Sequence, residues 1–256
     1  MVESTGERKR PSRSIYLLPN LFTTSALLAG FYSIILAYNG HFQSAGIEII
    51  VAMALDGLDG RVARMTNTTS QFGAEYDSMA DMISFGMAPS FLVYTWSLSS
   101  LTEAQYGQLG WVIPFVYTAC CGLRLARFNV AVGTADKRFF QGLACPSAAA
   151  ILASFVWVMT GLGIAGPDTV VLTLLLTLFT GIAMVSTITY YSFKDLGTNR
   201  KVPFAMLLAL LLLFVVTAVD PGKMILIASV TYGLSGPAYF LFRIYRKRSR
   251  SSRSQG

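Results

Sequence analysis

Long apolar runs, each about 20 residues, alternate with short polar connections over most of this chain. A helix of about 20 residues crosses a hydrocarbon core of about 30 Å, so runs of this length predict membrane-spanning helices. The pattern predicts an all-α polytopic membrane protein with about eight transmembrane helices. Their expected ranges are 20–38, 45–62, 73–98, 109–132, 143–162, 169–190, 202–219 and 224–242.

The two ends of the chain are polar and basic. We expect residues 1–14 and 243–256 to be cytoplasmic tails on either side of one membrane-embedded domain, 15–242. With eight spans, both ends and three connections share one side, and of the 20 lysines and arginines only Lys223 falls on the other. Basic residues accumulate on the cytoplasmic side. This asymmetry predicts a multi-pass protein of the cytoplasmic (inner) membrane with both termini in the cytoplasm.

Composition agrees with a membrane location. Hydrophobic residues make up 54% of the chain and charged residues 13%, against about 25% charged residues in soluble domains. The mean hydropathy is +0.55. The net charge of +7 therefore indicates orientation in the membrane and attraction to anionic membrane lipids, and not binding of nucleic acid. His41 is the only histidine, which excludes mechanisms that need two histidines in one chain.

The cysteines and several glycines are expected to serve packing. Cys120, Cys121 and Cys145 lack the spacing of a metal site or of a disulfide framework. Glycines inside apolar runs allow neighbouring helices to approach closely. We predict such contacts at Gly30, Gly161, Gly163 and Gly181.

Four of the 13 acidic residues fall in one short segment, where two predicted helices meet. Asp56 and Asp59 are three residues apart and Asp77 and Asp81 four apart, so on helices each pair lies on one face. Carboxylates at a membrane are costly unless they are paired or bind metal. Two adjoining helix ends would direct all four toward one point, where their oxygens suit two divalent cations, Mg²⁺ or Mn²⁺.

The residues around these aspartates fit chemistry on a phosphorylated substrate. Cations at this cluster would bind a pyrophosphate, and a carboxylate beside them can accept the proton of an attacking hydroxyl. Gly60, Ala63 and Gly73 have little or no side chain, which lets a substrate approach the backbone closely. Arg64 offers planar donors for a phosphate. The segment therefore indicates metal-assisted transfer of a phosphoryl-linked lipid at the cytoplasmic membrane face.

The same segment carries a family signature. It reads Asp56-x2-Asp59-Gly60-x2-Ala63-Arg64-x8-Gly73-x3-Asp77-x3-Asp81. With all of these fixed positions present, the chain resembles the CDP-alcohol phosphatidyltransferase family. The resemblance implies a CDP-linked lipid as donor, CMP as leaving group and a small alcohol as acceptor. It also implies that the four aspartates bind the two cations and that Asp81 is in addition the general base.

Further residues acquire expected roles through this resemblance. Pro19, Asn20 and Thr23 match residues at the start of the family's first helix and would close the nucleotide pocket. Plain capping of that helix, with Pro19 in its first turn, explains them equally well. The positions expected to contact the nucleotide-lipid from the signature segment are Gly60, Ala63, Arg64, Ser70 and Gly73.

The sequence outside the signature bears on the acceptor. Stretches 13–34, 72–89, 123–129 and 140–150 resemble membrane-embedded bacterial phosphatidylserine synthases. This resemblance implies transfer of the phosphatidyl group from CDP-diacylglycerol to L-serine by a homodimer. Phosphatidylglycerophosphate synthases usually have proline after the third aspartate of the signature and lysine after the fourth. This chain has Ser78 and Met82 at these positions, which argues against that group of enzymes. The segment 144–146 departs from the resemblance, since we would expect a proline directly after Gly-Leu, and it leaves the local helix start open.

A site for the serine carboxylate is expected where the fourth span reaches the cytoplasm. Arg124 and Arg127 are three residues apart and can point the same way. An arginine binds a carboxylate through two parallel hydrogen bonds, and Asn129 lies close by in the sequence. The alternative interpretation is that these arginines anchor the helix end and bind lipid headgroups.

Two other functions stay open on the sequence. The same metal site could serve transfer to choline, inositol or glycerol phosphate. A cation transporter could also use acidic residues in a membrane. A transporter would be expected to hold them near mid-bilayer, whereas these aspartates lie at helix ends beside cytoplasmic arginines.

Overall fold

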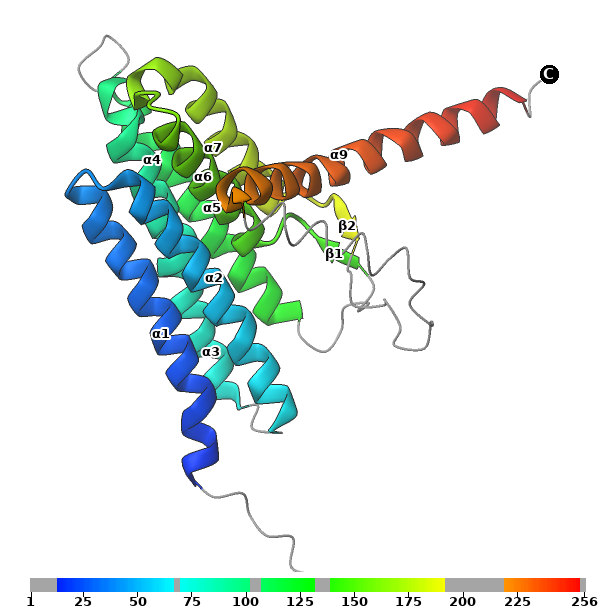
Figure 1. Ribbon diagram of the computed structural model, residues 1–256. Coiled ribbons are helices and arrows are strands. Elements are labelled where there is room, and N and C mark those ends of the chain that lie inside the picture. The colour runs from blue at the N-terminus through cyan, green and yellow to red at the C-terminus, as the bar shows by residue number, and fades with distance from the viewer. Residues whose placement is uncertain (1–12, 67–69, 102–106, 132–138, 192–218, 254–256) are drawn as a thin grey trace, which may run out of the picture.

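The computed structural model describes residues 13–66, 70–101, 107–131, 139–191 and 219–253 (Figure 1). The first two helices, α1 (Arg13–Tyr38) and α2 (Phe42–Met65), pack side by side. The turn between them is short because Gly40 adopts a φ of 78°, which glycine reaches without steric cost. Ser33 Oγ of α1 donates to the carbonyl of Ala45 of α2 over 2.8 Å, which fixes the pair beside the turn.

The third predicted span is a continuous helical segment with a change of winding. α3 (Gln71–Asp81) passes into a π-helix (Met82–Met87) and then into α4 (Ala88–Trp96). A π-turn inserts an extra residue into the helix and is often found at functional sites. Here it begins directly after Asp81, the last residue of α3. The side chains of α4 are therefore rotated relative to a regular continuation of α3.

Three apolar helices complete the bundle: α5 (Leu109–Ala131), α6 (Cys145–Gly161) and α7 (Val170–Val185). Two short 3-10 turns, Leu98–Leu101 and Gly166–Thr169, lie between the helices. Pro146 occupies the first turn of α6, so the helix starts at Cys145 despite the departure from the family pattern. The largest fully buried side chains of the core include Ile49, Phe85, Leu92, Tyr117, Ile151 and Leu152.

The helical prediction is confirmed, with one departure from an all-α fold. Strand β1 (Phe139–Gln141) pairs antiparallel with β2 (Thr189–Tyr191), and Phe140 lies opposite Tyr190. The expected sixth span, 169–190, was too long at its C-terminal end, because α7 ends at Val185 and the chain then enters β2. The predicted span 202–219 lies almost wholly outside the described residues.

The last helix, α9 (Pro221–Arg253), continues well past the expected end of the eighth span at 242. Its first turn is fixed by Asp220, which accepts from the backbone nitrogen of Lys223 over 3.1 Å and pairs with its Nζ over 2.8 Å. These bonds from Lys223 lower the pKa of Asp220. Figure 1 shows the C-terminal part of α9 extending away from the other helices.

Three described segments are long and apolar enough to cross a membrane. They are Asn20–Tyr38, Leu109–Val130 and Gly166–Val185, and α6 is a shorter apolar helix. Many large apolar side chains on the helices are exposed, for example Leu28 on α1 and Phe115 on α5. Such an apolar exterior is typical of a chain that packs against lipid.

Close helix contact is confirmed at two of the four glycines named above. A Cβ at Gly30 would lie 2.4 Å from Ser84 Oγ, and one at Gly181 would lie 3.3 Å from the Cα of Tyr117. The prediction is wrong for Gly161 and Gly163, where a Cβ would meet nothing within 4 Å. Both of these follow the packed part of α6, Gly161 as its last residue and Gly163 with φ of 73°.

Candidate functional site

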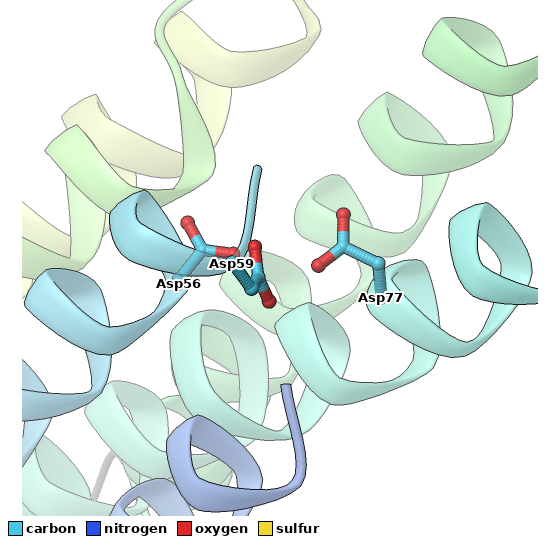
Figure 2. Close-up of side chains that lie close together, drawn as sticks. All are labelled: Asp56, Asp59 and Asp77. Carbon is cyan, nitrogen blue, oxygen red and sulfur yellow. The ribbon is translucent and has the colours of Figure 1, made fainter. Parts of the chain in front are cut away.

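Three aspartates from two helices meet at one point of the bundle. Asp56 and Asp59 extend from α2 toward Asp77 of α3 (Figure 2). One carboxylate oxygen of each lies within 4.8 Å of the others. The i, i+3 spacing puts Asp56 and Asp59 on one face of α2, and the short connection from α2 to α3 brings Asp77 opposite them.

Asp81 lies one turn beyond Asp77 on α3 and joins the same cluster through Asp56. The carboxyl groups of Asp77 and Asp81 both lie close enough to Asp56 to interact with it electrostatically. Asp81 does not belong to the compact group of three whose oxygens lie closest together. The structure thus brings all four predicted aspartates together, three in a tight group and Asp81 beside it.

The cluster has the properties of a cation site. Asp59 is only 6% exposed, and Asp56, Asp77 and Asp81 are half-buried. Oδ1 of Asp77 is buried and makes no hydrogen bond within the described part of the chain. Ionised carboxylates at such distances repel one another, and burial strengthens that repulsion. An all-oxygen donor set with an unsatisfied buried oxygen fits a hard divalent cation such as Mg²⁺ or Mn²⁺.

Thr23 connects the first helix to this cluster. Its Oγ1 donates a hydrogen bond to Asp59 Oδ2 over 2.8 Å. The expectation that Pro19 stands in the first turn is wrong, because α1 begins at Arg13 and all three family-matching residues lie inside it. Helix capping therefore does not explain Thr23. Asn20 directs Oδ1 toward Gly73, where a Cβ would lie 3.7 Å from it.

The residues expected to contact a nucleotide-lipid lie near the end of α2 and at the start of α3, the two helices that carry the aspartates. Ser70 is the N-cap of α3 and its Oγ accepts from the nitrogen of Gly73 over 3.0 Å. Gly60 is exposed, and a Cβ there would meet nothing within 4 Å, so this face of α2 is open. Ala63 and Arg64 belong to the last turn of α2, and their side chains lie outside the described part.

The two arginines of α5 have different surroundings. Arg124 Nη1 donates to Cys145 Sγ over 3.3 Å, while its Nε is buried and has no hydrogen-bond partner among the described residues. Arg127 donates from Nη1 to the carbonyl of Val185 over 3.2 Å and from Nη2 to Oε1 of Gln141. Arg127 therefore ties α5 to the end of α7 and to β1, whereas Arg124 keeps a donor available.

Asn129 of α5 contacts two residues of α3. Its Nδ2 donates to Ser78 Oγ over 3.0 Å and lies 3.5 Å from Glu75 Oε2. Ser78 is the neighbour of Asp77, so this contact fixes α5 against the helix that carries two of the aspartates. Asn129 was expected at a serine site, and in the structure it contributes to the position of α3.

Other contacts at the site had no distinctive signal in the sequence. Tyr76 OH and Thr24 Oγ1 lie 2.9 Å apart and join α1 to α3. Cys145, expected only to pack, lies beside Arg124. These contacts depend on which helices become neighbours, and hydrophobic periodicity does not specify that.

Comparison with known proteins agrees with this geometry. A protein of Helicobacter pylori (strain 26695) named CDP-diacylglycerol–serine O-phosphatidyltransferase is 38% identical over 205 residues, which cover 80% of this chain and 84% of the relative. A Mycobacterium leprae protein of the same name is 40% identical, over 56% of this chain and 47% of its own. The archaetidylserine synthase of Methanothermobacter thermautotrophicus is 36% identical, over 56% of this chain and 58% of its own.

The family model for CDP-alcohol phosphatidyltransferase matches residues 16–188. This range includes α2 to α7, all of α1 except its first three residues, and all four clustered aspartates. The match and the site geometry agree, and the chain belongs to the CDP-alcohol phosphatidyltransferase family.

Proposed function

We propose that this protein is a CDP-diacylglycerol–serine O-phosphatidyltransferase, which transfers a phosphatidyl group to L-serine and releases CMP. The observation that carries the chemistry is the meeting of Asp56, Asp59 and Asp77 within 4.8 Å at the junction of α2 and α3. The choice of serine is supported by the names of the relatives, among them one that aligns with most of this chain.

Asp56, Asp59, Asp77 and Asp81 would hold two divalent cations, Mg²⁺ or Mn²⁺. When bound, the cations would neutralise the pyrophosphate and the charge that develops on the leaving phosphate. The serine hydroxyl oxygen attacks the phosphatidyl phosphorus, and the bond from that phosphorus to the bridging oxygen of CMP breaks. Asp81 accepts the hydroxyl proton, a role that suits a carboxylate beside the compact group of three.

Substrate binding is assigned to the residues around this cluster. The open face of α2 at Gly60 gives the nucleotide-lipid access to the aspartates, together with Ala63, Arg64, Ser70, Gly73 and the α1 residues Pro19, Asn20 and Thr23. Arg124 is the better candidate for the serine carboxylate, because its Nε is a buried donor without a partner in the described part. Arg127 has two acceptors from the protein itself.

The placement in the membrane follows from the charge distribution. We propose about eight spans in the cytoplasmic (inner) membrane, with both termini and the aspartate cluster on the cytoplasmic side. One membrane-embedded catalytic domain, 15–242, is flanked by the tails 1–14 and 243–256. A homodimer is proposed by analogy with the family.

The acceptor is tested by measuring CMP release from CDP-diacylglycerol by the purified chain in detergent with Mn²⁺. L-serine, choline, inositol and glycerol phosphate are supplied one at a time. CMP release with L-serine alone supports the proposal. CMP release with another alcohol would show that this alcohol is the acceptor, and the proposed phosphatidyl transfer at the aspartates would stand. Ion flux through liposomes containing the chain, without CMP release, would support a cation transporter instead.

A further inference from the structure

The π-helix that follows Asp81 is bonded to the helices on two sides of it. Its central residues Ser84 and Phe85 are buried. Ser84 Oγ donates a hydrogen bond to the carbonyl of Ala26 in α1 over 3.1 Å. From the other side, the hydroxyl of Tyr117 in α5 donates to the carbonyl of Phe85 over 3.0 Å, and Tyr117 is itself fully buried. Two neighbouring residues of the π-helix are thus fixed, one to α1 and one to α5.

The carbonyl of Phe85 has a particular need for a donor. In an α-helix this carbonyl would accept from the backbone nitrogen four residues later. That residue is Pro89, which has no N–H to donate. A buried carbonyl without a donor is costly. Tyr117 supplies a donor at this point and fixes the position of the carbonyl relative to α5.

The winding of the segment decides how α3 is rotated against the core. One residue corresponds to about 100° of rotation around the axis of an α-helix, so loss of the extra residue of the π-turn would rotate α3 relative to α4. The side of α4 is anchored, because Leu92 and Val93 are fully buried in the core. Among the residues of α3, all of which the structure describes, only Ala80 is buried. A change of winding would therefore displace α3, which carries Asp77 and Asp81.

We propose that Tyr117 and Ser84 are positioning residues for the reaction, which hold the π-helix so that the carboxylate of Asp81 faces the other three aspartates. Neither side chain belongs to the aspartate cluster, so each acts through the backbone that follows Asp81. The consequence for turnover rests on the proposed function, in which Asp81 accepts the proton of the acceptor. The fixing of the π-helix does not rest on it and is measured separately.

The first test measures how firmly the π-helix is held, without any assay of turnover. Tyr117→Phe and Ser84→Ala each remove one hydroxyl donor. Amide hydrogen exchange is followed by mass spectrometry on the purified chain in detergent. We expect peptides that cover residues 82–88 to exchange about five- to tenfold faster in each variant than in the wild type. Unchanged exchange of this segment in a variant would overturn the role of the residue replaced.

The matched control is Tyr190→Phe. The hydroxyl of Tyr190 in β2 donates to the carbonyl of Gly233 in α9 over 3.2 Å, and Tyr190 is also buried. The control therefore removes the same atom from the same kind of bond, in a contact that does not involve the π-helix. We expect it to lower thermal stability as Tyr117→Phe does and to leave the exchange of residues 82–88 at the wild-type rate. Equal acceleration in this control would contradict a specific effect of Tyr117.

Kinetics of CMP release then test the effect on the reaction, with the acceptor that the wild-type chain uses. We expect kcat to fall about 10- to 100-fold in Tyr117→Phe and in Ser84→Ala, as for a misplaced catalytic group, while the KM of each substrate stays near the wild-type value. Tyr190→Phe should keep the wild-type kcat. A normal kcat in Tyr117→Phe and Ser84→Ala, or an equal fall in Tyr190→Phe, would overturn the positioning role. Absence of CMP release from the wild type itself would instead contradict the proposed function, and hydrogen exchange would still decide whether these residues hold the π-helix.

Discussion

Thr23 of α1 donates a hydrogen bond to Asp59 of α2 over 2.8 Å, although 36 residues separate them in the sequence. Asp59 is the most buried of the clustered carboxylates, at 6% exposure. A hydroxyl that donates to one carboxylate oxygen leaves the other oriented toward Asp56 and Asp77. The first helix therefore helps to set the geometry of the candidate metal site.

Replacing Thr23 should weaken metal binding more than it weakens folding. Thr23→Val keeps the shape of the side chain and removes the donor, and loss of such a supporting contact typically lowers metal affinity about 10- to 100-fold. We expect the Mn²⁺ concentration for half-maximal activity to rise by this factor, as measured by Mn²⁺ titration of CMP release. Thr23→Ser, which retains the hydroxyl, should stay near the wild type; equal effects of both changes would contradict this role.

The aspartates should separate into two classes. Asp77→Asn removes a charge from the compact group and should lower Mn²⁺ binding, measured by electron paramagnetic resonance of the bound ion. Asp81→Asn should lower Mn²⁺ binding less than Asp77→Asn does, because Asp81 lies outside the compact group of three. Its turnover should fall about 10²- to 10⁴-fold, the usual contribution of a general base. Normal turnover in folded Asp81→Asn would remove Asp81 from the reaction.

The two arginines of α5 should also differ. Arg124→Gln should raise the KM for L-serine with little change in the KM for CDP-diacylglycerol, because it removes the proposed carboxylate receptor. Arg127→Gln loses its bonds to Val185 and Gln141 and should mainly lower thermal stability. Kinetics with each substrate varied in turn, and melting followed by intrinsic fluorescence, separate the two effects. If instead Arg127→Gln raised the KM for L-serine and Arg124→Gln lowered only the thermal stability, the two roles would be reversed.

Close packing of α1 against the π-helix should make Gly30 intolerant of a side chain. A Cβ there would lie 2.4 Å from Ser84 Oγ and 2.7 Å from its Cα, and such overpacking typically costs about 1–3 kcal/mol. Gly30→Ala should therefore lower the melting temperature in detergent. Gly161→Ala is the matched control, since its Cβ would meet nothing within 4 Å; an equal loss in both variants would argue against the contact.

The features that could be predicted from the sequence are those that depend on the spacing of residues within one helix or between two consecutive helices. The intervals between Asp56 and Asp59 and between Asp77 and Asp81 place each pair on one helix face, and the short link between the helices makes them neighbours. The helical ranges followed from hydrophobic length in the same way. Both kinds of inference need only the geometry of a single helix and its connection.

Features that depend on packing between distant segments were not predicted. The π-helix after Asp81 contains no proline and no polar run that would mark it in the sequence. β1 and β2 have only three residues each, and their pairing depends on contacts with segments far away in the sequence, such as the hydrogen bond from Arg127 to Gln141. The Cys121–Cys145–Arg124 contact joins α5 to the start of α6, and composition alone suggested packing for both cysteines. Tertiary contacts decide these features, so hydrophobic periodicity does not reveal them.

The most direct test of the central claim is incorporation of isotope-labelled L-serine into lipid by the purified chain, supplied with CDP-diacylglycerol and Mn²⁺. The account predicts labelled phosphatidylserine in an amount equal to the CMP released, none after chelation of the metal, and none with Asp77→Asn. Unchanged labelling with chelator present or with Asp77→Asn would contradict a metal centre at these aspartates. Absence of labelled lipid from folded, metal-loaded protein would contradict the transfer to serine.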